Sequence, residues 1–288
     1  MISSLSNDQV LLITAGYDRT IRFWQAHTGS VCRTIMHEDS PTNCLSIFPD
    51  KTLLAAGSYQ HIKMYDLISN NPNPVMKLDQ LQKNIVTLGF SDDRRFMYSG
   101  GEDQLVRVWD MRGSKMKASR QMLASASVNC ATIHPNQVEL FIGDQDGAIY
   151  RWDIANEKQE KHVIDQNNPS AIRSLTINSE GTMMAAVTSS GNCYIWSLTG
   201  SFGEKMAHTK LVNRTSFTAH KRYALKCLFS PDMTLLATTS ADQTAKIWRT
   251  ADFSCQCELK DNHQQWVWDC AFTSDSQYLI TGEKPGCH

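Results

Sequence analysis

Residues 238–248 read TTSADQTAKIW, and the spacing of three residues within this segment indicates the fold. The hydroxyl of Thr238 is followed four positions later by Asp242, and Trp248 closes the stretch six positions after the acid. Asp and its polar neighbours favour a tight turn, because their side chains bond back to the nearby backbone. The stretch therefore predicts a turn between two short strands.

The same spacing recurs along the chain. The closing aromatic stands at Trp24, Tyr65, Trp109, Trp152, Trp196 and Trp248, at intervals of 41, 44, 43, 44 and 52 residues. Six residues before each aromatic stand Asp18, Tyr59, Asp103, Asp146, Ser190 and Asp242. Self-similarity at a steady interval is the signature of a repeat architecture, in which one supersecondary unit is copied.

Each repeat predicts about four strands. Residues 20–24 and 105–109 alternate with the period of two expected of strands, and upstream turns such as residues 48–50 and 230–232 precede apolar runs. A four-stranded unit of roughly 43 residues cannot bury both faces alone and stacks radially on its copies as a propeller blade. We therefore predict an all-β propeller with six complete or near-complete blades and a partial seventh.

The predicted boundaries follow the repeats. A tail over residues 1–9 precedes a single propeller domain over 10–282, and a divergent tail covers 283–288. The predicted blades span about 10–37, 38–79, 80–122, 123–165, 166–219, 220–262 and, in part, 263–282. Where the last repeat should continue into an Asp and a Trp, the chain reads GEKPGCH. We expect a chain shortened within the seventh blade. We also expect the insertion Ser201–Thr218 to be a polar, mobile surface loop.

The charge and the apolar content of the chain argue against nucleic acid and membranes as partners. Lys plus Arg total 28 against 29 for Asp plus Glu, a formal charge of −1, which favours neither nucleic acid nor an anionic membrane as partner. Residues 1–9 lack the basic and apolar regions of a secretory signal. An apolar stretch of the roughly 20 residues needed to span a bilayer is absent from the sequence. We predict a cytoplasmic protein that does not insert into membranes.

The cysteines and acids suggest neither a metal site nor catalysis. Nine cysteines at irregular spacings fit reduced thiols better than a disulfide framework. Cys255, Cys257, His263 and Cys270 could form a metal site, but packing or exposed thiols are the favoured interpretation. The Asp residues recur from blade to blade, as a catalytic group has no reason to do. Without a phosphate loop, a nucleophile elbow or a zinc motif, we predict no enzyme, no metal and no cofactor.

The repeated pattern resembles that of the WD-repeat family. In that family the Trp, the turn Asp, the hydroxyl and a loop His form a hydrogen-bonded group that locks each blade, and His220, Thr238, Asp242 and Trp248 match all four positions. The other candidate blade-locking residues are Asp18, Trp24, Asp103, Trp109, Asp146 and Trp152. The second and fifth repeats, which have Tyr59 and Ser190 at the acid position, are expected to lack the full group.

Loop sequences extend the resemblance. Residues 14–18, 69–74 and 222–225, among others, are similar to those of the G-protein-β-subunit-like WD-repeat subunits of the TOR kinase complexes. The resemblance implies a non-catalytic subunit that binds the kinase domain of the TOR kinase, joins other TOR-complex subunits and serves nutrient and growth-factor signalling, reaching the lysosomal surface through the complex. The alternative is another WD-repeat adaptor, such as a substrate receptor of a ubiquitin ligase.

A candidate partner-binding rim comes from the residues themselves. When the first strands are aligned on their last apolar residue, the positions six and four residues earlier fall on one rim of the predicted propeller. The candidate rim residues at these positions are Asn43, Tyr223, Trp266 and Trp268, and Tyr17, beside Asp18 in the first blade, is expected to be their neighbour in a closed ring. Clustered Trp and Tyr side chains suit a protein-binding hot spot, because they bury much area at little entropic cost. The alternative is that Trp266 and Trp268 cover the core of the last blade.

Overall fold

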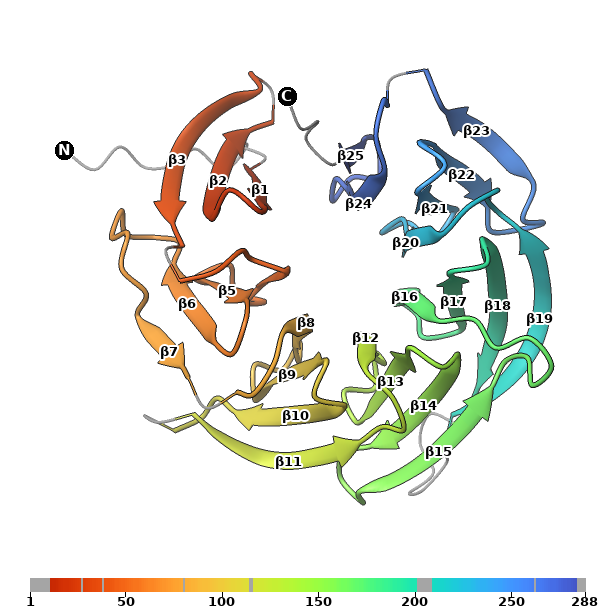
Figure 1. Ribbon diagram of the computed structural model, residues 1–288, viewed down its shortest axis with the longest axis horizontal. Helices are drawn as coiled ribbons and strands as arrows, with labels where there is room; N and C mark the ends of the chain where they lie inside the picture. The colour runs from red at the N-terminus through yellow and green to blue at the C-terminus, as the bar shows by residue number, and fades with distance from the viewer. Residues whose placement is uncertain are drawn as a thin grey trace. The chain divides into compact units, whose positions relative to one another are not determined.

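The computed structural model of the chain describes residues 11–26, 28–37, 39–79, 81–113, 116–200, 209–261 and 263–283 (Figure 1). These residues form twenty-five strands in seven antiparallel sheets. The prediction of an all-β fold of four-stranded repeats is confirmed, since five sheets have four strands, one has three and the last has two. The chain forms two compact units, Met1–Gln121 and Met122–His288.

The first unit contains the three-stranded sheet and two four-stranded sheets, and its boundary falls within the last strand of the third sheet. The strands are β1 (Leu11–Ala15), β2 (Thr20–Gln25), β3 (Ser30–Met36), β4 (Cys44–Ile47), β5 (Leu53–Gly57), β6 (Ile62–Asp66), β7 (Met76–Leu78), β8 (Ile85–Phe90), β9 (Phe96–Gly101), β10 (Leu105–Asp110) and β11 (Lys117–Leu123). Within each sheet, strands that are consecutive in the chain pair as neighbours.

The second unit contains three four-stranded sheets and the two-stranded sheet. The strands are β12 (Val128–Ile133), β13 (Glu139–Asp144), β14 (Ala148–Asp153), β15 (Lys158–Val163), β16 (Ile172–Ile177), β17 (Met183–Thr188), β18 (Asn192–Thr199), β19 (Lys210–Thr218), β20 (Ala224–Phe229), β21 (Leu235–Ser240), β22 (Ala245–Arg249), β23 (Cys255–Leu259), β24 (Val267–Phe272) and β25 (Leu279–Glu283). In this unit the first strands β12, β16, β20 and β24 contact one another in succession (Figure 1).

The core lies between consecutive sheets rather than within one. In the first unit, Ile21 of β2 packs in one cluster with Leu54 and Tyr65 of the next sheet. In the second unit, Phe141 of β13 packs with Ile172 of β16. Each fully buried aliphatic or aromatic side chain contributes about 1.5–3 kcal/mol. A single repeat would lose this burial, which is why the unit must be copied to be stable.

A tight turn with one left-handed residue follows the acid position in six repeats. The residues with positive φ are Arg19, Gln60, Gln104, Gly147, Gly191 and Gln243. Glycine is required most clearly at position 191, where a Cβ atom would lie 2.3 Å from the carbonyl oxygen of His220. The recurring turn holds the second and third strands of each repeat in register.

The prediction that Ser201–Thr218 forms a loop is wrong for the second half of this segment. Residues 210–218 form β19, which pairs with β18 along its whole length, while residues 201–208 lie outside the described ranges. The segment is polar because an outermost strand needs few apolar residues. One of them, Phe217, packs on Trp248 with ring centroids 4.6 Å apart. The polar composition of residues 210–218 is therefore that of an edge strand and not of a loop.

The ends of the predicted domain can be compared only in part. The two-stranded sheet of β24 and β25 corresponds to the predicted partial seventh blade, and β25 reaches Glu283, one residue past the predicted end at 282. Residues 1–10 and 284–288 lie outside the described ranges. The described residues contain no helix that could span a lipid bilayer.

Candidate functional site

The first strands of five sheets share a β-bulge near their starts. The register shifts at Val86, Asn129, Arg173, Leu225 and Trp268, on β8, β12, β16, β20 and β24. A bulge leaves one residue outside the regular pairing and re-aims its side chain. Each bulged residue is the one that lies four positions before the last apolar residue of its strand. At the predicted rim positions, the bulges thus change the direction of the side chains from the one that a regular strand would give them.

Three of the predicted rim residues form one aromatic patch in the second unit, composed of Tyr223, Trp266 and Trp268. The Tyr223 and Trp266 rings are perpendicular, with centroids 6.4 Å apart, and the Trp266 and Trp268 centroids are 5.7 Å apart. Tyr223 directly precedes β20, and Trp266 directly precedes β24. Because these two strands are neighbours, residues more than forty positions apart come into contact (Figure 1).

The aromatic patch is accessible to a partner. Tyr223 is 49% exposed and Trp268 45% exposed, whereas Val267 between the two tryptophans is fully buried. Along β24, Val267 and Cys270 are buried, and the bulge leaves Trp268 on the exposed side between them. Trp266 is half-buried, so it covers part of the core and also supports its two more exposed neighbours. Such a cluster offers a large apolar surface for protein binding.

The other two predicted rim residues, Tyr17 and Asn43, belong to the first unit. Tyr17 is 77% exposed in the turn between β1 and β2. Asn43 is exposed just before β4, and its amide donates a hydrogen bond to Asn84 Oδ1 over 3.3 Å. Their part in partner binding stays a prediction.

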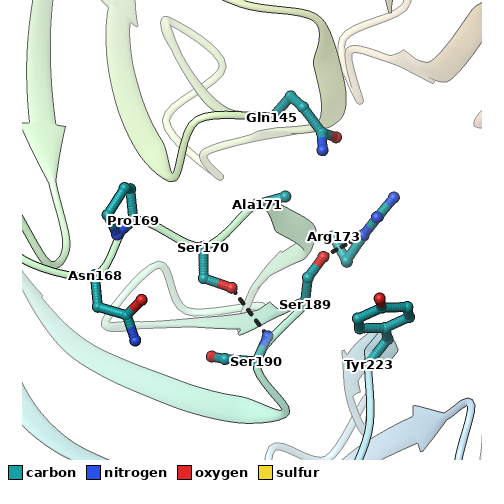
Figure 2. Close-up of a pocket in the computed structure, with 9 residues that line it drawn as sticks. All are labelled: Gln145, Asn168, Pro169, Ser170, Ala171, Arg173, Ser189, Ser190 and Tyr223. Atoms are coloured by element: carbon teal, nitrogen blue, oxygen red, sulfur yellow. Dashed lines mark hydrogen bonds between the residues drawn. The ribbon is translucent and has the colours of Figure 1, made fainter.

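A shallow pocket of about 380 Å³ lies beside the aromatic patch (Figure 2). It is lined by Gln145, Asn168, Pro169, Ser170, Ala171, Arg173, Ser189, Ser190 and Tyr223. The loop before β16 forms one wall, and Tyr223, which also belongs to the aromatic patch, forms part of another (Figure 2). Arg173 Nε donates to Ser189 Oγ over 2.7 Å, and the Ser190 backbone N–H donates to Ser170 Oγ over 2.9 Å. The pocket and the aromatic patch therefore share one side chain and form a continuous surface.

The four residues of the sixth repeat meet in one hydrogen-bonded group. Trp248 Nε1 donates to Thr238 Oγ1 over 2.9 Å, and His220 Nε2 lies 2.8 Å from the same hydroxyl. His220 Nδ1 lies 3.1 Å from Asp242 Oδ2. A carboxylate only accepts, so Nδ1 carries the proton and Nε2 accepts from Thr238. Burial alone would raise the pKa of Asp242, but hydrogen bonds from His220 and Thr244 outweigh it and hold that pKa well below its usual range.

The first and third repeats pair their acids with arginine. Trp24 donates to Thr14 and Trp109 to Ser99, over 2.8 and 2.9 Å. Asp18 and Asp103 form ion pairs of 2.6 Å with Arg22 and Arg107, four residues later in each case. Sequence reasoning missed this partner, although an Arg recurring four positions after the Asp was the available signal.

The fourth repeat corrects the predicted role of Asp146. Asp146 is exposed, whereas Asp144, two residues earlier, is fully buried. Asp144 Oδ1 accepts from the backbone N–H of Ala148 over 2.8 Å, and Asp144 Oδ2 accepts from the Tyr150 hydroxyl over 3.0 Å. The Asp-x5-Trp spacing selected Asp146, but the repeat lacks a loop His that would hold an acid there. Trp152 is buried, and its part in a blade-locking group stays a prediction.

The second repeat forms a different buried group around His37. His37 Nδ1 lies 2.8 Å from the Tyr65 hydroxyl, and its Nε2 lies 2.7 Å from Ser58 Oγ and 3.1 Å from His61 Nε2. The signal was present in the sequence, since His37 precedes Tyr65 by the same 28 residues that separate His220 from Trp248. Burial and the nearby Lys63 lower the pKa of His37 to about 4, and burial raises the pKa of Tyr65 to about 12.

We expect this group to make the protein acid-sensitive. Because folding lowers the pKa of His37 from 6.5 to about 4, the unfolded chain binds the extra proton first as pH falls. The stabilisation is complete above pH 6.5 and is lost as pH falls toward 4. Urea unfolding should show that the wild-type free energy of unfolding falls by about 1–3 kcal/mol more than that of His37→Asn between pH 7 and 4. Equal losses in the two proteins would contradict the assignment.

The eight cysteines that the structure describes are free thiols in different settings. Cys130, Cys193, Cys227 and Cys270 are buried, as expected of small apolar residues in strands, whereas Cys255 and Cys257 are exposed on β23. Burial raises the pKa of Cys227 to about 12, which keeps its thiol protonated and unreactive.

Comparison with known proteins identifies the repeat. The family described as "WD domain, G-beta repeat" matches residues 2–25, 29–66, 73–110, 211–249 and 253–287. The unmatched interval contains the fourth and fifth repeats, in which Ile142 replaces the hydroxyl and Ser190 replaces the acid.

Proteins from animals and fungi are similar over most of the chain. "Target of rapamycin complex subunit LST8" of Mus musculus is 49% identical over 272 residues, which cover 92% of this chain and 82% of the mouse protein. "Protein LST8 homolog" of Drosophila melanogaster is 47% identical, covering 91% of this chain and 82% of the fly protein. "Target of rapamycin complex subunit LST8" of Saccharomyces cerevisiae is 43% identical, and the match covers 88% of this chain and 82% of the yeast protein.

Proposed function

The chain belongs to the WD-repeat β-propeller family and, within it, to the LST8 subunits of the Target of rapamycin (TOR) complexes, and from this premise we propose that it is a non-catalytic subunit that binds the TOR kinase. It joins the other subunits of a TOR complex and supports the kinase domain in nutrient and growth-factor signalling. Its place is the cytoplasm, with access to the lysosomal surface through the complex.

The aromatic patch is the observation that best supports a binding role. Trp266 contacts both Tyr223 and Trp268 at the starts of two neighbouring strands, and these two outer side chains are about half exposed. Residues of this kind dominate the energetics of protein interfaces, because they bury a large area at little entropic cost. We propose that the kinase domain contacts Tyr223, Trp266 and Trp268, with Tyr17 and Asn43 as further contacts.

Co-purification from cells tests this proposal. Trp268→Ala should reduce the TOR kinase recovered with the tagged protein at least tenfold, since a hot-spot residue contributes about 2 kcal/mol or more. The level of the tagged protein itself should stay unchanged.

Tyr278→Ala is the matched control, because Tyr278 is a 70% exposed aromatic in the turn before β25, outside the aromatic patch. It should leave kinase recovery unchanged. If Trp268→Ala lowers the protein level and kinase recovery equally, Trp268 serves packing instead. Recovery of ubiquitin-ligase components in place of the kinase would favour the alternative adaptor role.

A further inference from the structure

We propose that the pocket beside the aromatic patch receives a carboxylate side chain of the bound partner, with Arg173 as its recognising group. The inference rests on the proposed function and adds the chemistry of the contact. The partner segment would present an Asp or Glu to Arg173 and an apolar residue to Tyr223 and its neighbours.

The charge of the pocket favours an acid. Among the nine lining residues, all of which the structure describes, Arg173 carries the only formal charge. The remaining polar side chains of the lining are the hydroxyls of the serines and of Tyr223 and the amides of Asn168 and Gln145, which can donate hydrogen bonds to an anion. Lys221 and Arg222, which directly precede Tyr223, are also exposed. A segment carrying negative charge is therefore complementary to this side of the aromatic patch.

The geometry holds the Arg173 guanidinium ready for a carboxylate. Arg173 is the bulged residue of β16, and its Nε is already bound to Ser189 Oγ over 2.7 Å. That bond orients the planar group, while the N–H groups on Nη1 and Nη2 form the fork that matches a carboxylate. Figure 2 shows the guanidinium in the pocket between Gln145 and Tyr223.

A carboxylate fits better than a phosphate. Phosphorylated motifs are recognised by clusters of arginines, and this pocket has a single one. Arg173 occupies in β16 the bulge position that Trp268 occupies in β24. Two repeats, separated by the one that contains β20, thus offer a cation and an aromatic ring from equivalent positions. A partner segment with an acidic residue near an apolar one would use both.

The test combines crosslinking with charge exchange. The photo-crosslinking residue p-benzoylphenylalanine, placed at the exposed pocket position Asn168 of the full chain in cells, should crosslink to a TOR-kinase segment that contains an Asp or Glu. Arg173→Glu should reduce kinase recovery at least tenfold, and changing the crosslinked acid to Arg should restore it. Arg173→Gln, which removes the charge but keeps a donor, should reduce recovery about fivefold. Arg249→Glu, an equal charge change at an exposed position outside the pocket, should have no effect.

The outcomes separate the two proposals. Loss of the kinase with Trp268→Ala but not with either Arg173 variant overturns the carboxylate inference and leaves the proposed function intact. A crosslinked segment without an acidic residue, or a charge exchange that fails to restore recovery, also overturns it. If the wild-type protein recovers no TOR kinase, the proposed function itself fails.

Discussion

Replacing Glu139 with alanine is expected to lower the free energy of unfolding by about 3 kcal/mol, because the buried Arg151 guanidinium loses its buried acid and keeps only the exposed carboxylate of Glu160. Glu139 and Arg151 are 3% and 5% exposed, and Arg151 Nη1 lies 3.3 Å from Glu139 Oε1. A buried ion pair adds little net stability over apolar packing, but removal of one partner is costly since the other charge stays buried. Urea denaturation at pH 7 measures the loss.

Glu139 also holds the chain where it enters the outer strand of the following repeat. The Thr209 backbone N–H donates to Glu139 Oε1 over 3.2 Å, and the Thr209 hydroxyl donates to Oε2. Arg151 Nη1 donates to the Thr209 carbonyl over 2.6 Å. The ion pair of the fourth repeat thus fastens the start of β19, so its loss should also expose that strand to proteolysis.

Glu160→Ala is the matched control. Glu160 pairs with the same arginine, Arg151, at 2.6 Å, but its side chain is 56% exposed. An exposed ion pair contributes about 1 kcal/mol or less, so this variant should unfold almost like the wild type. Equal destabilisation by the two variants would mean that burial is not what makes Glu139 important.

The inner strands of each repeat were predictable because the same local sequence pattern occurs several times along the chain. An acid, a left-handed turn residue and a closing aromatic recur at similar intervals. The second and fifth repeats have Tyr59 and Ser190 in place of the acid, but their strands can still be predicted by alignment with the other repeats. The outer strands follow no such rule. β15 and β23 are exposed almost throughout, and β19 was mistaken for a loop, since an edge strand is defined by its pairing and needs little apolar sequence.

The aligned first strands predicted the rim positions, but only the aromatic side chains among them indicated a binding site. Trp266 and Trp268 stand out in the sequence, and aligning the first strands placed Tyr223 beside them. The bulge that turns Arg173 into the pocket is a feature of register, which depends on the partner strand. The contact of Glu139 with Thr209 spans 70 residues, and the pocket combines side chains from three repeats. Neither leaves a local pattern.

The hydrogen-bonded, blade-locking group of the sixth repeat is expected to contribute strongly to the free energy of unfolding. We expect Asp242→Ala to lower the free energy of unfolding by about 3 kcal/mol at pH 7, because His220 and Thr244 lose a charged acceptor in a buried setting. The Asp242 side chain is only 11% exposed and also accepts from the backbone N–H of Lys221 over 3.1 Å. Asp18→Ala, at the equivalent position of the first repeat, should cost about 1 kcal/mol or less, since the Asp18 side chain is 48% exposed.

The pH dependence of that difference identifies the charge as its cause. Folding holds the pKa of Asp242 below the ordinary value of 3.8, so the carboxylate stabilises the fold fully above that value and progressively less as pH falls toward the folded-state pKa. The gap in urea midpoint between wild type and Asp242→Ala should therefore be constant from pH 7 to 5 and shrink by pH 3. If the gap is the same at pH 3, the lost packing of the side chain, and not its bonds to His220 and Thr244, accounts for the destabilisation.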